Sequence, residues 1–265
     1  MQLAAPEIDR SARIPESDAA VRLGFRFGNK GSHSSRTLML AELEQLMAGT
    51  AQKTDAAGYL SAIVEDNLTD KKTVATRRIT GQRLRELYAL DPTVPIFRTL
   101  RHLWDIDGDG RPLLALLCSL ARDPMLRATA SSILALPIGD ELPRQQLAQG
   151  VGEIAGNRLN ESIADKAARN IASTWTQTGH LEGRVRKIRR RVQATPGSLA
   201  LALLFGHWLG LRGNRLFQSF WCTVLDSSFD QLVHVATDAK RLGLIELKRA
   251  GEVIEIKFGT WTGVK

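Results

Sequence analysis

Three groups of Lys and Arg side chains are the residues of this chain best suited to contact a polyanion, because each cation can neutralise one phosphate. The first group lies in a helix expected over 69–88, with Thr69 or Asp70 as its N-cap. Positions 71, 74 and 78 would share one helix face and positions 72 and 76 another, so one side could present several phosphate contacts. The proposed contacts, which include two hydroxyl donors, are Lys71, Lys72, Thr73, Thr76, Arg77 and Arg78.

The second group is the run from Arg184 to Arg191, where six of the eight residues are basic. In a strand these side chains would alternate between two faces, and in a helix they would encircle the axis. Both arrangements leave little apolar surface, so we expect the run to be exposed rather than buried. A solvated charged surface is the alternative to a binding site. The proposed contacts are Arg184, Arg186, Lys187, Arg189 and Arg190.

The third group, Lys248 and Arg249, lies in a segment that repeats the local pattern around the second group. An Ile-Ala pair at 171–172 is followed seven residues later by Gly179, and a Val-Ala pair at 235–236 is followed by Gly243 at the same distance. In both copies a helix-period segment ends at the Gly, which suits a left-handed helix stop, and residues typical of strands follow. A helix, a Gly stop and a basic hairpin are the outline of a winged-helix unit, although ordinary helix-to-strand junctions give the same pattern.

The elements that must position these groups are mostly helices, separated by Pro and Gly. We expect a mainly α fold of helical bundles with winged-helix-like units and small β-hairpin wings. The expected division is a flexible N-terminal arm over 1–25, a helical domain over 26–138 and a C-terminal helical domain with winged-helix-like units over 139–265. Helical segments are expected near 38–47, 59–67, 69–88, 96–104, 113–122, 125–136, 144–157, 163–178, 198–211, 216–225 and 229–242.

The composition favours a globular protein with a polyanionic partner. The chain has 265 residues, of which 43% are hydrophobic and 24% charged, and its net charge is +8. The basic excess is concentrated, with nine basic against four acidic residues over 151–200. The most apolar run, over 199–211, is shorter than the roughly 20 residues that cross a bilayer, so we expect a buried helix and no membrane association. The N-terminus is polar and has no signal peptide pattern, so we expect a cytoplasmic protein.

The sequence offers no catalytic or metal-binding motif, and we predict no cofactor. The segment Asp105–Gly110 begins like a calcium-binding loop, but its twelfth position would be Leu116, where that loop needs a bidentate Glu. We expect a solvated turn there. Cys118 and Cys222 lie in apolar helical segments far apart, so we expect two buried free thiols rather than a metal site or a disulfide.

In its layout the chain resembles the BrxA family of BREX phage-defence systems. The resemblance rests on three segments: Asp70–Arg78 leading to Leu87-Tyr88, Leu113–Leu120 followed by Arg122-Asp123-Pro124, and Lys166–Ile171 leading to Gly179. It covers roughly residues 30–182. It implies an α-rich, winged-helix-like or NusB-like protein that is not an enzyme and binds DNA. The length and the C-terminal hairpin of this chain depart from the family pattern, which leaves open a standard BREX operon or a related defence cassette.

The expected function is therefore that of a DNA-binding accessory protein of an antiphage system, which contacts double-stranded DNA mainly through phosphates. One alternative is a scaffold that docks an acidic surface of a larger defence enzyme, since a basic face serves that purpose too. Another is a winged-helix transcriptional regulator, which would need a dimer and a palindromic operator.

Overall fold

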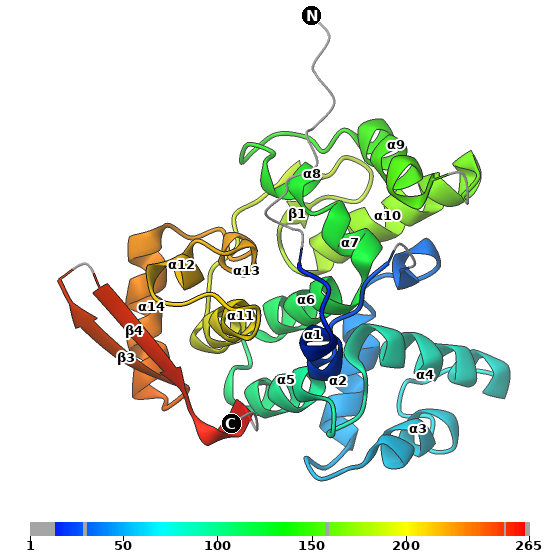
Figure 1. Cartoon of the computed structure of the whole chain (residues 1–265). Helices are drawn as coiled ribbons and strands as arrows, with labels where there is room; N and C mark the ends of the chain where they lie inside the picture. Colours follow the sequence, from blue (N-terminus) through cyan, green and yellow to red (C-terminus); the bar gives the residue numbers. More distant parts are fainter. Residues whose placement is uncertain (1–13, 29–30, 157–158, 252, 263–265) are drawn as a thin grey trace, which may run out of the picture.

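The computed structural model of the protein describes residues 14–28, 31–156, 159–251 and 253–262. In this part of the chain 14 α-helices and two small antiparallel sheets form the structure, which confirms the predicted mainly α fold with small hairpins (Figure 1). The helices of the first half are α1 (Asp18–Leu23), α2 (Leu40–Gly49), α3 (Ala56–Val64), α4 (Val74–Tyr88), α5 (Pro95–Ile106), α6 (Arg111–Arg122), α7 (Pro124–Ala128) and α8 (Ser131–Leu134). Those of the second half are α9 (Arg144–Ala155), α10 (Glu161–Gln177), α11 (Pro196–Trp208), α12 (Asn214–Phe217), α13 (Phe220–Thr223) and α14 (Phe229–Arg241). The strands are β1 (Leu181–Glu182), β2 (Ile188–Arg189), β3 (Ile245–Ala250) and β4 (Val253–Phe258), and the short 3-10 helices are η2 (Ser32–Ser34) and η4 (Thr260–Thr262).

Two apolar helices, α6 and α11, lie at the centre of the core. Every residue from Leu113 to Ala121 in α6 is buried, and so is every residue from Gly197 to Gly206 in α11. A helix that is apolar on all sides must be surrounded by other elements, and α6 packs against α4, α5, α7 and α11. Buried side chains from Ala20 to Ile256 belong to one continuous core. The predicted division between residues 138 and 139 therefore crosses that core, and it stays a prediction.

Part of the expected N-terminal arm is ordered structure. Ser17 caps α1 by accepting a hydrogen bond from the amide of Ala20, and both Ala20 and Phe25 are buried. The Phe25 ring packs edge-on against Phe205 of α11, at 5.5 Å between centroids. Residues 1–13 of the expected arm lie outside the described residues.

The predicted repeat of a helix, a Gly and a hairpin is present twice. Helix α10 leads through Gly179 to β1 and β2, and α14 leads through Gly243 to β3 and β4. Both glycines have positive φ angles, 82° and 71°, which a residue with a Cβ adopts only at a cost. The order of α11, α12 with α13, α14, β3 and β4 is that of a winged-helix unit, with α14 packed on both α11 and β3.

The start of α4 differs from the sequence expectation. Asn67 and Asp70 have positive φ angles, and the Asn67 side chain accepts a hydrogen bond from the amide of Lys71 at 2.8 Å, so the segment turns before it becomes helical. The N-cap is Thr73, whose hydroxyl accepts from the amide of Thr76 at 3.1 Å. Positions 71 and 72 thus precede the helix, and the expected helix faces that include them do not form.

The acidic turn before α6 is not simply solvated. Asp107 is buried, and its carboxylate accepts hydrogen bonds from the Thr195 hydroxyl at 2.5 Å and from the Gly197 amide at 2.8 Å. It also accepts from the amide of Gly110 at 3.0 Å. Asp107 therefore caps the start of α11 from a distant part of the chain, a role that the sequence pattern did not indicate.

Candidate nucleic-acid interface

Most of the proposed contact residues in the first basic group are engaged in bonds within the protein. Lys71 forms an ion pair with Glu42, with 2.8 Å between Nζ and Oε1. Arg77 donates hydrogen bonds to the carbonyl oxygens of Lys71 and Val64, both at 3.1 Å, and so holds the turn before α4. The hydroxyls of Thr73 and Thr76 contact each other at the helix cap. The exposed cations that remain in this group are Lys72 and Arg78, neither of which pairs with a described carboxylate.

Arg189 of the second group is buried, which corrects the expectation that the whole run is exposed. Only 1% of the residue is accessible. Its guanidinium makes a bidentate ion pair with Asp226, at 2.5 and 2.8 Å, and donates to the carbonyl of Ile133 at 3.0 Å. The backbone of Arg189 bonds to residues 139 and 140 on one side and lies opposite Leu181 of β1 on the other, which fixes the residue in the interior. An always-charged side chain in that place needs a carboxylate partner.

The other cations of the run project from what we call the first hairpin, residues 181–191. Arg184 and Arg191 are exposed and have no described carboxylate partner. Arg186 is 76% exposed beside Glu141, and this contact raises the pKa of the guanidinium. Arg190 pairs with Glu182 at 2.5 Å, and both side chains are about half exposed or more. Such exposed pairs contribute little stability, so these arginines can exchange a carboxylate for a phosphate.

A side-chain contact within the first hairpin holds its turn. The Nζ atom of Lys187 donates to the carbonyl of Gly183 at 2.6 Å, and Gly183 has a φ of 104°. In all, the first hairpin offers five accessible cations against the two carboxylates of Glu182 and Glu141. Its accessible cations are Arg184, Arg186, Lys187, Arg190 and Arg191.

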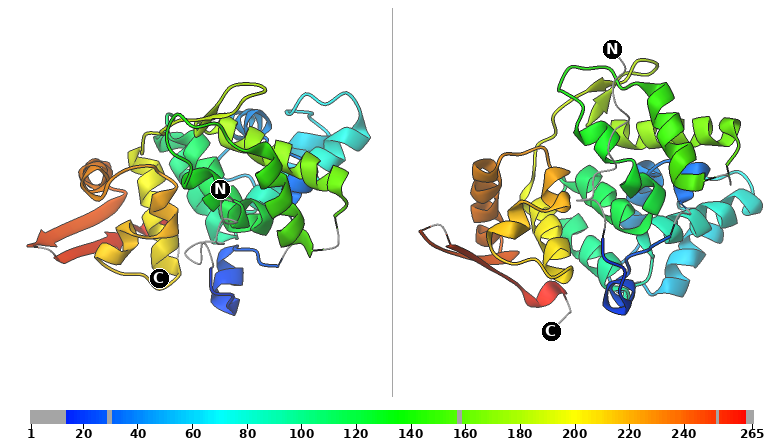
Figure 2. Two further views of the ribbon diagram at one scale, coloured as in Figure 1. Left: turned by 90° about the horizontal axis from the view of Figure 1, so that it is seen from above. Right: turned by 45° about the horizontal axis from the view of Figure 1, so that its top comes forward.

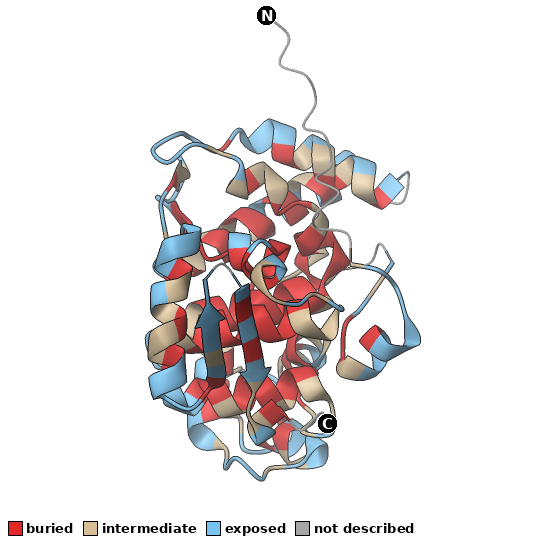
Figure 3. Ribbon diagram, turned by 60° about the vertical axis from the view of Figure 1, so that its left-hand side comes forward, coloured by how far each residue is buried: buried red, intermediate tan, exposed pale blue. Residues whose placement is uncertain are grey.

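The second hairpin, residues 245–258, carries a nearly balanced charge. On its outer face Lys248 stands opposite Glu255, and Glu246 stands opposite Lys257. Arg249 lies on the other face near the tip and donates to the carbonyl of Gly251 at 3.2 Å. In Figure 3 the residues of β4 alternate between buried and exposed, as expected for a strand that covers a core on one side. Of the two hairpins, the second is thus the weaker anion site.

The two hairpins are joined to opposite ends of α14. Asp226, the partner of Arg189, lies just before the N-cap of α14, Ser228, and the second hairpin follows the helix C-terminus. His180 fixes the same junction by contacts of Nε2 with the Val224 carbonyl at 2.8 Å and of Nδ1 with the Thr178 hydroxyl at 3.0 Å. Burial lowers the pKa of His180 to about 4, so the ring is neutral at physiological pH.

The three basic groups do not share one surface. The second and third groups lie at the two ends of α14, whereas α4 and the second hairpin lie at opposite sides of the molecule in both views of Figure 2. Sequence reasoning missed the exposed Arg212 and Arg215, which flank Gly213 beside the backbone of β4. Both are isolated arginines outside any run of charge, so the sequence analysis did not single them out.

One buried cluster has the residue types of a proton relay. His33 contacts the Asp123 carboxylate at 2.7 Å through Nδ1 and the Thr174 hydroxyl at 2.8 Å through Nε2. All three side chains are essentially inaccessible, so no substrate can reach them, and the cluster instead ties η2 to α7 and α10. Sequence reasoning did not connect these residues, which lie up to 141 positions apart.

The described residues hold no group of three His, Cys, Asp or Glu side chains that could bind a metal ion. Cys118 and Cys222 are free and buried, as predicted, and burial raises the pKa of the Cys222 thiol to about 12. Among the helices of the described ranges, none combines the length and the apolar character needed to cross a bilayer. The chain matches no family model, no curated protein and no solved structure.

Proposed function

We propose that the protein binds duplex DNA, mainly through phosphates, with the first hairpin as its principal contact. The observation that carries this proposal is the excess of accessible cations on that hairpin, five against two carboxylates, on a turn that projects from the body. Phosphate oxygens are the ligands that guanidinium groups bind best, and duplex DNA presents them at a regular spacing.

The position of α14 between the hairpins supports the same function. A helix of 13 residues is about 20 Å long. In a winged-helix unit such a helix enters a groove while the hairpin contacts the flanking backbone. The exposed polar side chains along α14 are Asp230, Gln231, His234, Lys240 and Arg241; Lys240 donates to the Leu247 carbonyl, and Arg241 pairs with Asp238. Asp230 repels phosphate, and few donors remain for base edges, so the expected sequence preference is weak.

The wider role that we propose is that of a non-enzymatic accessory component of an antiphage system in the cytoplasm. Its support is the layout resemblance to the BrxA family and the absence of any catalytic motif in the sequence. The genes that flank this one test the assignment. Neighbours that encode no defence enzymes would contradict the antiphage role without affecting the DNA-binding proposal.

Fluorescence anisotropy with a labelled 30-base-pair duplex tests DNA binding. If the five accessible cations of the first hairpin each contact one phosphate, log K should fall against log salt with a slope of about −4.5. Two duplexes of unrelated sequence should bind with similar affinity. A folded protein that fails to bind either duplex at 50 mM salt would refute the proposal.

A further inference from the structure

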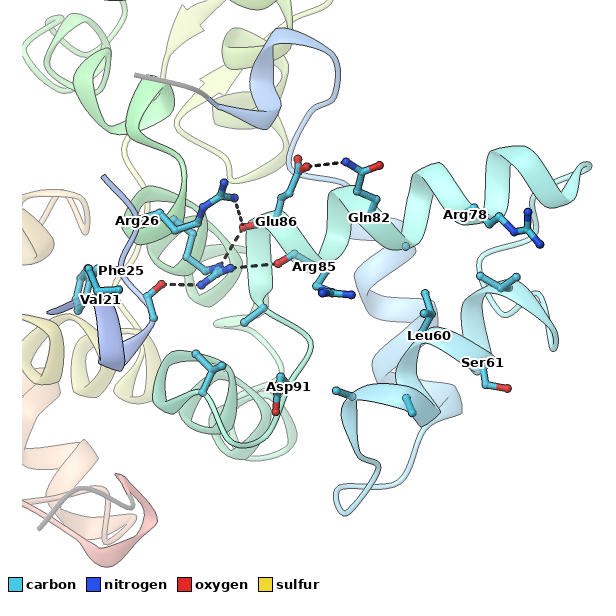
Figure 4. Close-up of a pocket in the computed structure, with 18 of the residues that line it drawn as sticks. Val21, Phe25, Arg26, Leu60, Ser61, Arg78, Gln82, Arg85, Glu86 and Asp91 are labelled. Carbon is cyan, nitrogen blue, oxygen red and sulfur yellow. Dashed lines mark hydrogen bonds between the residues drawn. The ribbon is translucent and has the colours of Figure 1, made fainter. Parts of the chain in front are cut away.

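A groove between α1, α3 and α4 has the features of a second binding surface. It has a volume of about 1290 Å³, larger than the roughly 300–1,000 Å³ typical of small-molecule sites. Figure 4 shows residues of all three helices around it, with Val21 on α1, Leu60 on α3 and Arg78 and Arg85 on α4. Helices α3 and α4, which supply half of its lining residues, lie on the side of the molecule away from the second hairpin (Figure 1).

The floor of the groove is apolar. Val21 and Leu60 line it and are 53% and 42% exposed, which is unusual for large aliphatic side chains. Ala56 and Ala57 extend the apolar surface along α3. Gly81 of α4 lets Leu60 approach closely, since a Cβ at position 81 would lie 3.2 Å from a Leu60 methyl carbon.

The rim of the groove is cationic. Arg22, Arg78 and Arg85 are exposed, and none of the three pairs with a carboxylate of the described residues. At the end of α4, Arg26 and Arg122 both donate to the carbonyl oxygen of Glu86, at 3.3 and 3.0 Å, so two further charges meet there. Their backbone acceptors belong to a helix C-terminus, which stabilises cations but does not neutralise them.

The lining holds three carboxylates against five arginines, and one of those carboxylates, that of Glu86, is paired with Arg83 outside the lining, so the groove keeps a net positive charge. The Glu86 carboxylate accepts hydrogen bonds from the Ser32 hydroxyl and from Arg83, both at 2.7 Å and both outside the lining, and from the amide of Gln82 in the lining at 3.1 Å. Asp91 accepts from the amide and hydroxyl of Thr93. Glu65 is the remaining acidic side chain of the lining.

We propose that this groove docks an acidic amphipathic helix of a partner protein. The apolar face of such a helix would cover Val21 and Leu60, and carboxylates on its flanks would pair with Arg22, Arg78 and Arg85. Arginine forks bind carboxylates in a bidentate manner, and the covering helix would exclude water from the pairs and strengthen them. Duplex DNA fits less well, because a phosphate backbone offers nothing apolar to cover the exposed valine and leucine.

A designed helical peptide of 18 residues, with Leu on one face at helical spacing and Glu on the other, serves as the probe. We expect the labelled peptide to bind the full chain at low salt, and a shuffled peptide of the same composition to bind much more weakly. Leu60→Ser and Arg85→Gln should each reduce the affinity about tenfold, as expected for central anchors of a small interface. The matched controls Ile79→Ser, an exposed apolar residue of α4 outside the groove lining, and Lys53→Gln should leave it unchanged.

Three outcomes would overturn the proposal. The first is a peptide affinity that both groove variants leave unchanged while circular dichroism shows that they are folded. The second is a loss of duplex DNA binding in Arg85→Gln, which would make the groove part of the DNA surface. The third is a dimer that Leu60→Ser dissociates, which would identify a second copy as the occupant. Because the groove variants leave the first hairpin intact, a failed peptide experiment does not test the DNA proposal.

Discussion

Neutralising the first hairpin should abolish most of the salt dependence of DNA binding without unfolding the protein. The variant changes Arg184, Arg186, Arg190 and Arg191 to Gln, which removes four accessible charges and keeps much of the side-chain length. Each lost phosphate contact lowers the magnitude of the salt slope by about 0.9, so the slope should shrink by about 3.6 units. This difference does not depend on how many contacts the rest of the protein adds.

The size of the effect is large enough to measure directly. With five contacts, the wild-type affinity should fall about 500-fold between 50 and 200 mM salt, whereas a variant that retains only Lys187 should lose about 3- to 4-fold. The assay is anisotropy of one labelled duplex across that salt range, with circular dichroism melting as the folding control. Exposed substitutions of this kind should leave the melting temperature nearly unchanged.

Arg189→Gln is the matched control within the same run. It removes one charge from the same segment, but from a buried pair whose loss leaves Asp226 uncompensated. We expect this single change to cost about 3–5 kcal/mol of stability. A folded four-residue variant whose salt slope equals that of the wild type would refute the assignment of the first hairpin to DNA. A normal melting temperature for Arg189→Gln would refute the buried ion pair.

Three further predictions concern the core. Labelling of Cys118 and Cys222 by a thiol reagent should be slow in the native protein and fast after unfolding, because both are buried; fast native labelling of either would contradict the structure. Burial lowers the pKa of His180 to about 4 from an unfolded value of 6.5, so the unfolded state binds the proton first as the pH falls. Stability in urea should therefore drop by roughly 3 kcal/mol between pH 7 and pH 4 through this residue, and His180→Gln should flatten that part of the profile. Asp107→Ala should lower the free energy of unfolding by about 1–3 kcal/mol, because it leaves the Gly197 amide and the Thr195 hydroxyl without their buried acceptor; an unchanged urea midpoint would show that the cap is dispensable.

Local signals in the sequence were sufficient to predict much of the fold. The helix periods gave the main helices, and the spacing of Gly179 and Gly243 after their helices predicted two left-handed stops, each followed by a hairpin. Both signals act within a few residues, so neither depends on the tertiary structure. The predicted N-cap of α4 was wrong by three or four residues, because Thr73 rather than Thr69 or Asp70 caps the helix, and only the backbone of the preceding turn decides between them.

The sequence could not predict in the same way which charged side chains are buried and with which residues they pair. Arg189 pairs with a residue 37 positions away, and Lys71 pairs with one 29 positions away. A count of charges along the sequence cannot identify such partners, and it treats a buried arginine and an exposed one alike. The groove was missed for a related reason, because its arginines come from α1, the segment after it, α4 and α6, and form no run.

The burial of Arg189 also explains how an exposed basic turn can be held in a fixed place. Because strand side chains alternate, a shift of one residue in the β1–β2 register would move Arg189 to the surface and turn Ile188 or Arg190 inward. The bidentate pair with Asp226 opposes that shift and joins the hairpin to the start of α14. A binding surface supported by such a contact loses less entropy when it meets its ligand. Within one run of eight residues, then, Arg189 is buried and sets the position of the hairpin, whereas the arginines around it are exposed, either without a described carboxylate partner or in exposed pairs that a phosphate can replace.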